Sequence, residues 1–512
     1  MGFISARFRI CLLFLFGLMT SVCMRSHFSM TVVCMMKRAP MTNETVSISS
    51  SSVADPSQNC PRYEEEEEEE GTVTSHEGEL DWPRERMPYL FTVVLAGQMP
   101  TLLLSMKLAE TVSPKKMILG AVLAQVLVSF LSPLLARWSY WAFFATRLAM
   151  GMAEGLVLAP VGAIASRWFP LNERATLVAL YTSSFQIAFG VAPLIVSQVC
   201  SSRILGGWPS AFYFFGVLGL LWCVEWLRVG SDGPEHSRFI EEKEREWLKE
   251  QLPPRIKKAF RGRPLYSRML TSPVLLAHLA GMIGVHFTVG IISSFLPLFF
   301  EERLGLPLKK NGFFTVAPFV GQIFLKNGLA MVFDALKRRK ILGHTAASKI
   351  AQGLASIGSA VAFVVLVSFA DCRHPFFALS TLVVCCSVLA CSAIGFHTTM
   401  LHICPPLTGT IIAFISAMGV LSSGVSTTIM GIASNNPYKY EIAFGLAALL
   451  NFITGTIYLI WGTADEQPWI EKVGEKGVQD AIGEECLVKK TEEELEREEA
   501  EECLRELPVE GV

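Results

Sequence analysis

The stretch MILGAVLAQVLVSFLSPLLA, residues 117–136, contains no charged side chain and is bounded by Lys115, Lys116 and Arg137. Twenty residues of α-helix extend about 30 Å, which is the thickness of the hydrocarbon core of a bilayer. This stretch is therefore predicted to cross a membrane. Similar runs recur along the 512-residue chain, and the charged residues, 18% of the total, gather in the short segments between them. This distribution indicates a polytopic membrane protein in the lipid bilayer.

Twelve spans are predicted from these runs. The first continues to Met36 without a small-residue cleavage site, which favours a retained helix over a signal peptide. The predicted spans begin near Ile10, Pro88, Met117, Tyr140, Ala175, Trp208, Pro273, Gly312, Thr345, Phe376, Gly409 and Tyr440.

The thirteen cysteines do not suggest a zinc site, because no CxxC or Cys/His spacing occurs. Most are expected to be buried free thiols that pack as small apolar side chains. That group comprises Cys11, Cys23, Cys34, Cys223, Cys385, Cys386 and Cys391. Cys60, Cys200 and Cys372 lie at or outside span ends, and their pairing stays open.

Lysine and arginine in short loops predict the orientation, because cytoplasmic loops carry an excess of both. Basic clusters follow spans 2 and 8 and lie between spans 6 and 7, so these loops are predicted to be cytoplasmic. An even number of spans then places both termini there. The loop 38–87 is predicted to be exoplasmic, and it carries an N-glycosylation acceptor at Asn43.

The longest charged segment between spans divides them six and six. We expect an all-α fold in which residues 1–228 form one six-helix bundle, with the loop 38–87, and residues 269–464 form a second. Residues 229–268 are a cytoplasmic linker with an amphipathic surface helix, and residues 465–512 are an acidic cytoplasmic tail. Two related halves joined by a charged linker are typical of secondary transporters.

Four charged residues fall inside predicted spans, where a charge is costly and usually faces a cavity or a partner. Arg147 and Glu154 share span 4, and their seven-residue spacing places them on one face about 10 Å apart. Arg25 lies within span 1, with His27 nearby, and Lys326 lies within span 8. A structural polar pair within the bundle, and snorkelling of Lys326 to the interface, are the alternatives.

Two arginines facing a cavity would bind an anion, because guanidinium stays charged and grips carboxylate or phosphate in bidentate fashion. Glu154 could exchange a proton as the solute enters and leaves, and His27 is a second candidate for that proton. The chain has no Walker A motif, and no nucleophile–base constellation is evident, so an ATP-driven pump and an enzyme are disfavoured. Neither a cofactor nor a metal is expected, and the net charge of −2 argues against nucleic-acid binding.

Several motifs resemble the family of sodium–phosphate cotransporters, sialin and vesicular glutamate transporters, which belongs to the major facilitator superfamily. The resemblance runs from Arg25 to Trp469. It is carried by residues 147–155 followed by Pro160, and by RWFPLNER at 167–174, GWPSAFY at 207–213, LTSP at 270–273 and QPW at 467–469.

The resemblance implies the major facilitator fold, with alternating access to a central anion site that includes Arg25, Arg147 and Glu154. This chain also departs from the family pattern, because Val285, beside His286, occupies the place of a span 7 arginine. We therefore hypothesise that Lys326 supplies the missing cation and helps to bind the substrate.

The sequence as a whole predicts a secondary active transporter of an organic anion or inorganic phosphate, coupled to H⁺ or Na⁺. A non-transporting receptor or scaffold with the same fold is one alternative. Transport of a neutral or cationic solute, with Glu154 as counter-charge, is another. The expected location is the plasma membrane or an endolysosomal or vesicular membrane, with a monomer as the default state.

Overall fold

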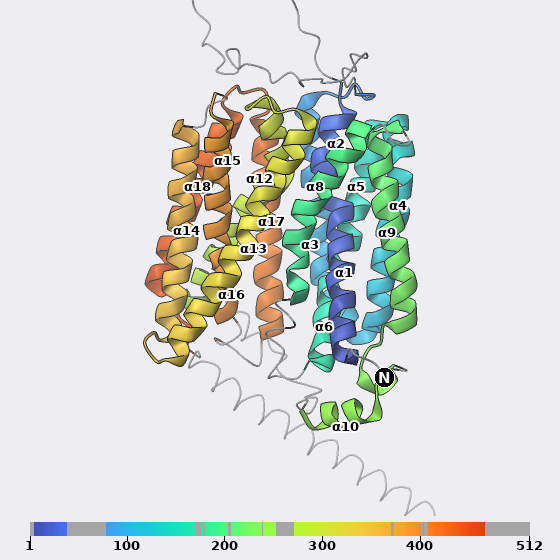
Figure 1. Ribbon diagram of the computed structural model, residues 1–512, viewed down its shortest axis with the longest axis vertical. Coiled ribbons are helices and arrows are strands. Elements are labelled where there is room, and N and C mark those ends of the chain that lie inside the picture. Colours follow the sequence, from blue (N-terminus) through green and yellow to red (C-terminus); the bar gives the residue numbers. More distant parts are fainter. Residues whose placement is uncertain are drawn as a thin grey trace, which may run out of the picture.

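Twelve helices in the described part of the chain are long and apolar enough to cross a membrane, as the sequence predicts (Figure 1). The computed structural model describes residues 5–37, 78–169, 177, 180–202, 206–237, 239–251, 271–369, 373–400, 403 and 408–465. Within these ranges the regular elements are helices, apart from one isolated bridge between Met36 and Leu80. The predicted glycosylation residue Asn43 and the acidic tail lie outside the described residues.

The first half of the chain contains α1 (Ala6–Ser26), α2 (Phe28–Met35), α3 (Met87–Thr111), α4 (Pro114–Trp138), α5 (Tyr140–Gly155), α6 (Leu158–Trp168), α8 (Ser184–Ser202) and α9 (Trp208–Val229). The linker carries α10 (Glu242–Gln251). The second half contains α12 (Pro273–Glu302), α13 (Leu308–Arg338), α14 (His344–Phe369), α15 (Pro375–Leu389), α16 (Phe396–Thr399), α17 (Thr408–Ile432) and α18 (Lys439–Trp461). The first predicted span thus consists of α1 and α2, which meet at His27.

Each half packs mainly on itself. In the first half α3 packs on α5, α4 on α9, and α1 on α8 and α9, whereas in the second half α12 packs on α17 and α18, α14 on α18, and α13 on α15. The two halves meet where α8 packs on α13, α3 on α17, and α2 on α12. Segments far apart in the sequence therefore lie side by side along the middle of the molecule (Figure 1).

A disulfide between Cys34 and Cys200 joins the ends of α2 and α8. The prediction that Cys34 is a free thiol is therefore wrong. The two cysteines are 166 residues apart in sequence and only their folded positions bring their Cα atoms to 6.3 Å, a separation that a disulfide requires. We call this end of the bundle the disulfide end, and the opposite end, where α10 and the start of α1 lie, the linker end (Figure 1).

Contacts between the halves run from the disulfide end to the middle of the bundle. Near that end, the hydroxyls of Thr92 on α3 and Thr427 on α17 are 2.8 Å apart, and the rings of Phe91 and Phe295 are 5.1 Å apart. Nearer the middle, Leu102 packs in one apolar cluster with residues of α17. The halves are thus closed toward the disulfide end by small polar and aromatic contacts.

The α10 helix docks on the start of α1 at the linker end. The Glu244 carboxylate accepts hydrogen bonds from the backbone N–H groups of Ala6 at 2.9 Å and Arg7 at 3.4 Å. The guanidinium of Arg7 also lies over the ring of Trp247, at 4.3 Å from its centroid. A carboxylate at a helix N-terminus satisfies N–H groups that have no partner inside the helix, so the predicted surface helix of the linker is anchored to the first bundle.

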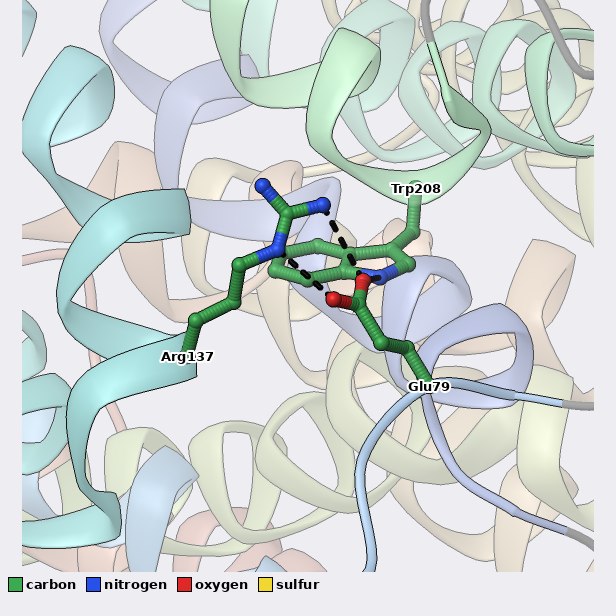
Figure 2. A network of polar contacts seen from close by, with 3 residues as sticks. All are labelled: Glu79, Arg137 and Trp208. Atoms are coloured by element: carbon green, nitrogen blue, oxygen red, sulfur yellow. Dashed lines mark hydrogen bonds and ion pairs between the residues drawn. The ribbon is translucent and has the colours of Figure 1, made fainter.

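A polar clamp holds the segment before α3 against the disulfide end (Figure 2). The Glu79 carboxylate accepts two hydrogen bonds from Arg137 at the end of α4, at 2.7 and 3.1 Å, and one from the indole N–H of Trp208 at 3.1 Å. The bonds from Arg137, and secondarily the one from Trp208, lower the pKa of Glu79. The clamp therefore ties three separate segments of the first half together.

Replacing Glu79 with glutamine should lower thermal stability at neutral pH by less than about 1 kcal/mol, because the pair is about half exposed. A carboxylate whose pKa is depressed by folding stabilises the fold above its unfolded pKa, and this contribution is lost as the pH falls through the folded pKa. The difference between wild type and Glu79→Gln, measured by thermal unfolding in detergent, should shrink between about pH 7 and about pH 3. Glu85→Gln is the control, and a pH-independent difference would contradict the prediction.

Two glycines allow α3 and α5 to pack with their backbones in contact. A Cβ atom added at Gly151 would overlap the backbone carbonyl of Val94, and one added at Gly155 would overlap the Thr101 hydroxyl. Because Gly151 lies between Arg147 and Glu154, this packing also fixes the part of α5 that carries both charges.

Gly151→Ala should destabilise the protein by about 1–3 kcal/mol, since a backbone atom cannot yield as a flexible side chain can. Gly162→Ala on α6 is the matched control, because a Cβ there has nothing within 4 Å and alanine favours the helix by about 1 kcal/mol. Thermal unfolding of both purified variants checks this. Equal stability of the two would show that α3 and α5 are not in backbone contact.

Candidate functional site

Arg25 and Glu154 form an ion pair that joins α1 to α5 inside the first half. The Nε atom of Arg25 is 3.2 Å from Oε2 of Glu154, and their side chains are 19% and 8% exposed. The pair connects segments 129 residues apart in sequence, so the spacing of charges along span 4 alone could not reveal it. An ion pair with so little exposure is screened weakly by solvent.

Arg147 completes the group from one helical face of α5. Its side chain is fully buried, with the guanidinium 4.4 Å from the centroid of the Phe28 ring. One Nη atom donates to the backbone carbonyl of Arg25 at 3.1 Å, which lies in the last turn of α1, where helix carbonyls lack intrahelical partners. Among the described residues, Nε and the other Nη of Arg147 find no acceptor.

The three side chains carry one net positive charge. Glu154 interacts electrostatically with both Arg25 and Arg147, and the two arginines repel each other. Buried N–H groups without acceptors are costly, and a buried unpaired positive charge more so. An anion that reached the Arg25–Arg147–Glu154 group would supply both the missing acceptors and the missing negative charge.

His27 occupies the junction between α1 and α2, with its ring directed at α9. The ring stacks on Phe215 at 5.3 Å and meets Phe212 edge-on at 4.5 Å, while Nδ1 lies 3.1 Å from the Thr31 hydroxyl. It is also an electrostatic neighbour of Arg147. The side chain is fully buried, and its ring packs between α1 and α9. Its role in proton coupling stays a prediction.

The second half contributes His286 near Arg25, and Lys326 near a second histidine. Lys326 lies half-buried on α13 and interacts electrostatically with His397 on α16. Val285 is buried on α12, and its neighbour His286 interacts electrostatically with Arg25. Sequence reasoning noted His286 only as the neighbour of Val285, because a single sequence does not show which residue of α12 faces the other half. In the described part of the chain, no three His, Cys, Asp or Glu side chains are placed to hold a metal ion.

A family model described as Major Facilitator Superfamily matches residues 14–355. The chain belongs to the major facilitator superfamily. Its helices superimpose on the partially occluded, inward-open structure of the xylose transporter XylE from E. coli with a TM-score of 0.63, covering 90% of this chain and 98% of that one. At 13% identity, that similarity supports the fold alone.

Relatives of this superfamily member include an uncharacterized transporter and a transporter named for glutamate. The uncharacterized transporter slc-17.3 of Caenorhabditis elegans is 29% identical over 481 residues, which cover 91% of this chain and 89% of that protein. Vesicular glutamate transporter 2 of Homo sapiens is 23% identical over 406 residues, covering 78% and 69%. The predicted family resemblance is confirmed, and the protein is a multi-pass membrane protein of a transporter family.

The charge balance of the Arg25–Arg147–Glu154 group predicts an asymmetry between variants. Glu154→Gln leaves two positive charges without a counter-charge, whereas Arg25→Gln leaves Glu154 paired electrostatically with Arg147. Breaking a buried pair costs about 3–5 kcal/mol, and we expect Glu154→Gln to be at the upper end and Arg25→Gln at the lower.

Thermal unfolding of the purified variants checks this order. The double variant Arg25→Gln/Glu154→Gln should be more stable than Glu154→Gln alone, because it removes one of the two unpaired positive charges. Glu242→Gln is the control, because it removes an ion pair with Arg245 in which Glu242 is 65% exposed and which should contribute little. Greater damage from Arg25→Gln than from Glu154→Gln would contradict this charge balance.

Proposed function

We propose that the protein is a secondary active transporter of an organic anion or inorganic phosphate, with Arg25 and Arg147 as the anion-binding residues. The observation that carries the proposal is the net positive, buried group with two N–H donors of Arg147 left without acceptors. Arginine forks match the planar oxygens of carboxylate and phosphate. The name of the human relative, a vesicular glutamate transporter, supports an anionic solute.

Glu154 couples transport to a cation gradient in this proposal. Without solute, Glu154 is the counter-charge that neutralises Arg25. When an anion binds the same guanidinium groups, it competes with the carboxylate, and protonation of Glu154 removes the repulsion between two anions. Solute and H⁺ would then bind together, whereas Na⁺ would act as the alternative by neutralising the carboxylate directly.

Alternating access follows from two bundles that rock against each other, here residues 1–228 and 269–464, connected by the linker 229–268. Hydrogen bonds and ring contacts between the halves at the disulfide end, such as Thr92–Thr427 and Phe91–Phe295, support closure on that side. Arg25 precedes the end of α2 by ten residues, about 15 Å along the helix axis, and so lies farther from the disulfide end than these contacts. Opening toward the linker end would therefore expose the site to one compartment only.

The linker end is cytoplasmic in this proposal, and so are both chain termini. Disulfides form and persist in oxidising compartments such as the ER lumen and the extracellular space. The Cys34–Cys200 disulfide therefore supports an exoplasmic disulfide end. The start of α1 and the end of α18 lie at the other end, where the Thr345 hydroxyl at the start of α14 donates to Asp465.

Uptake into proteoliposomes tests the function. Labelled phosphate, sialate, glutamate, urate and a neutral sugar are offered, with a pH gradient, a Na⁺ gradient and a membrane potential imposed separately. We expect uptake of at least one anion, abolished in Arg147→Ala and reduced more than about tenfold in Arg147→Lys, because an ammonium cannot bind in bidentate fashion.

The control is Arg245→Ala on the exposed linker helix, which should transport as wild type does. The gradient that drives uptake identifies the coupling ion, and Glu154→Gln should lose dependence on it. Background uptake of every solute by wild type and Arg147→Ala alike would contradict the proposal and favour a non-transporting scaffold. Uptake of the neutral sugar alone would favour a neutral solute.

A further inference from the structure

We propose that His286 and His397 form a second binding face that holds the distal polar group of an organic anion. This inference rests on the proposed function, in which the first anionic group of the solute binds Arg25 and Arg147. Imidazole N–H groups donate to carboxylate, carbonyl or hydroxyl oxygens even when the ring is neutral. The two histidines would therefore select for solutes that carry an acceptor at their far end.

The position of His286 is fixed by α17. Gly419 leaves room for the ring, since an added Cβ would lie 2.9 Å from Cγ of His286. The hydroxyls of Ser422 and Ser423 donate to the backbone carbonyls of Ile283 and His286 at 2.8 and 2.7 Å. These contacts hold α12 and α17 together at this level, so His286 is held on a rigid pair of helices.

His397 is positioned by the residues on either side of it on α16. The Phe396 ring lies against Gly281 of α12, and the Thr399 hydroxyl lies 2.8 Å from Nε2 of His278 on the same helix. The His397 ring stacks on Phe396 at 4.2 Å. The short α16 helix is thereby docked on α12, which brings His397 near His286.

The two rings have basic electrostatic neighbours on both sides of the interface between the halves. We call Arg25, His286, His397 and Lys326 the basic series. His397 interacts with His286, His278 and Lys326, and His286 interacts with Arg25 of the first half. The series thus leads from the Arg25–Arg147–Glu154 group to the second half. Lys326, twelve residues before the end of α13, and His286, thirteen residues after the start of α12, both lie about 18–20 Å from the linker end.

A comparison with His278 separates a binding role from a structural one. Both ring nitrogens of His278 have partners, the Val274 carbonyl and the Thr399 hydroxyl, each at 2.8 Å, so this histidine is structural. Neither His286 nor His397 makes a side-chain hydrogen bond to any described residue, and both are partly exposed within the bundle. Their donors are available to a solute.

Transport kinetics test the second face directly. His286→Ala and His397→Ala should each raise the KM for glutamate and sialate at least fivefold while leaving the KM for inorganic phosphate, too small to span both faces, within twofold. His286→Gln should recover part of the loss, because its amide donates a hydrogen bond. His374→Ala, at an exposed histidine before α15, is the control. Unchanged KM for every transported organic anion in both alanine variants would overturn the inference and leave the proposed function intact.

Thiol modification tests the same face without any transport. His397→Cys is treated with anionic sulfonatoethyl and cationic trimethylammonioethyl methanethiosulfonate, against the unsubstituted chain, whose described free cysteines are buried. The ratio of the anionic to the cationic reaction rate should be at least fivefold higher for His397→Cys than for a free thiol in solution. Adding the Lys326→Gln substitution should lower this ratio.

This measurement also decides the inference where wild type transports none of the solutes. A preference for the anionic reagent would then support an anion-binding face in a chain that does not transport them. The absence of modification, or a preference for the cationic reagent, would overturn the inference whatever the uptake experiment gives.

Discussion

The cost of holding a charge away from water governs the arrangement of the first half. An unpaired charge in the middle of a membrane span costs at least a few kcal/mol, and here three charged side chains share one location. Glu154 offsets part of the cost for Arg25, and the ring of Phe28 and a backbone carbonyl offset part for Arg147. The remaining positive charge is the feature that a purely structural ion pair would lack.

The same constraint explains why the bundle packs as it does around these residues. Arg25 reaches Glu154 only if α1 and α5 are close, and α5 is positioned by its backbone contact with α3 through Gly151. The disulfide end of the second half is held by two ion pairs, which are stronger contacts than those between the halves. Lys439 bonds Glu302 and Arg303 bonds Glu441, both at 2.7 Å, where α12 meets α18. Between the halves, single hydroxyl bonds and ring contacts, each worth about 1 kcal/mol, are easier to break.

Hydropathy alone predicts the number of spans and, within a few residues, most of their starts, because a bilayer imposes helix length on any apolar segment. The Cys34–Cys200 disulfide, the Arg25–Glu154 pair and the clamp of Glu79 on Arg137 and Trp208 could not be predicted, since each joins segments that only the tertiary fold brings together. The division of the first span into α1 and α2 at His27 was also not predicted, because no proline or glycine marks it in the sequence.

The family resemblance implies an arginine where this chain has Val285, and in our proposal the neighbouring His286 takes over part of its role. A guanidinium on α12 would add a second permanent charge opposite Arg25, and the site would then suit a solute with two full negative charges. An imidazole on the adjacent residue retains a hydrogen-bond donor without a permanent charge, so the proposed site suits a solute with one anionic group and one neutral acceptor. Lys326 lies further along the same basic series, and its electrostatic partner is His397. In the proposed function, donors on α12, α13 and α16 therefore take the place of one fixed cation in the second half, opposite the Arg25–Arg147–Glu154 group of the first.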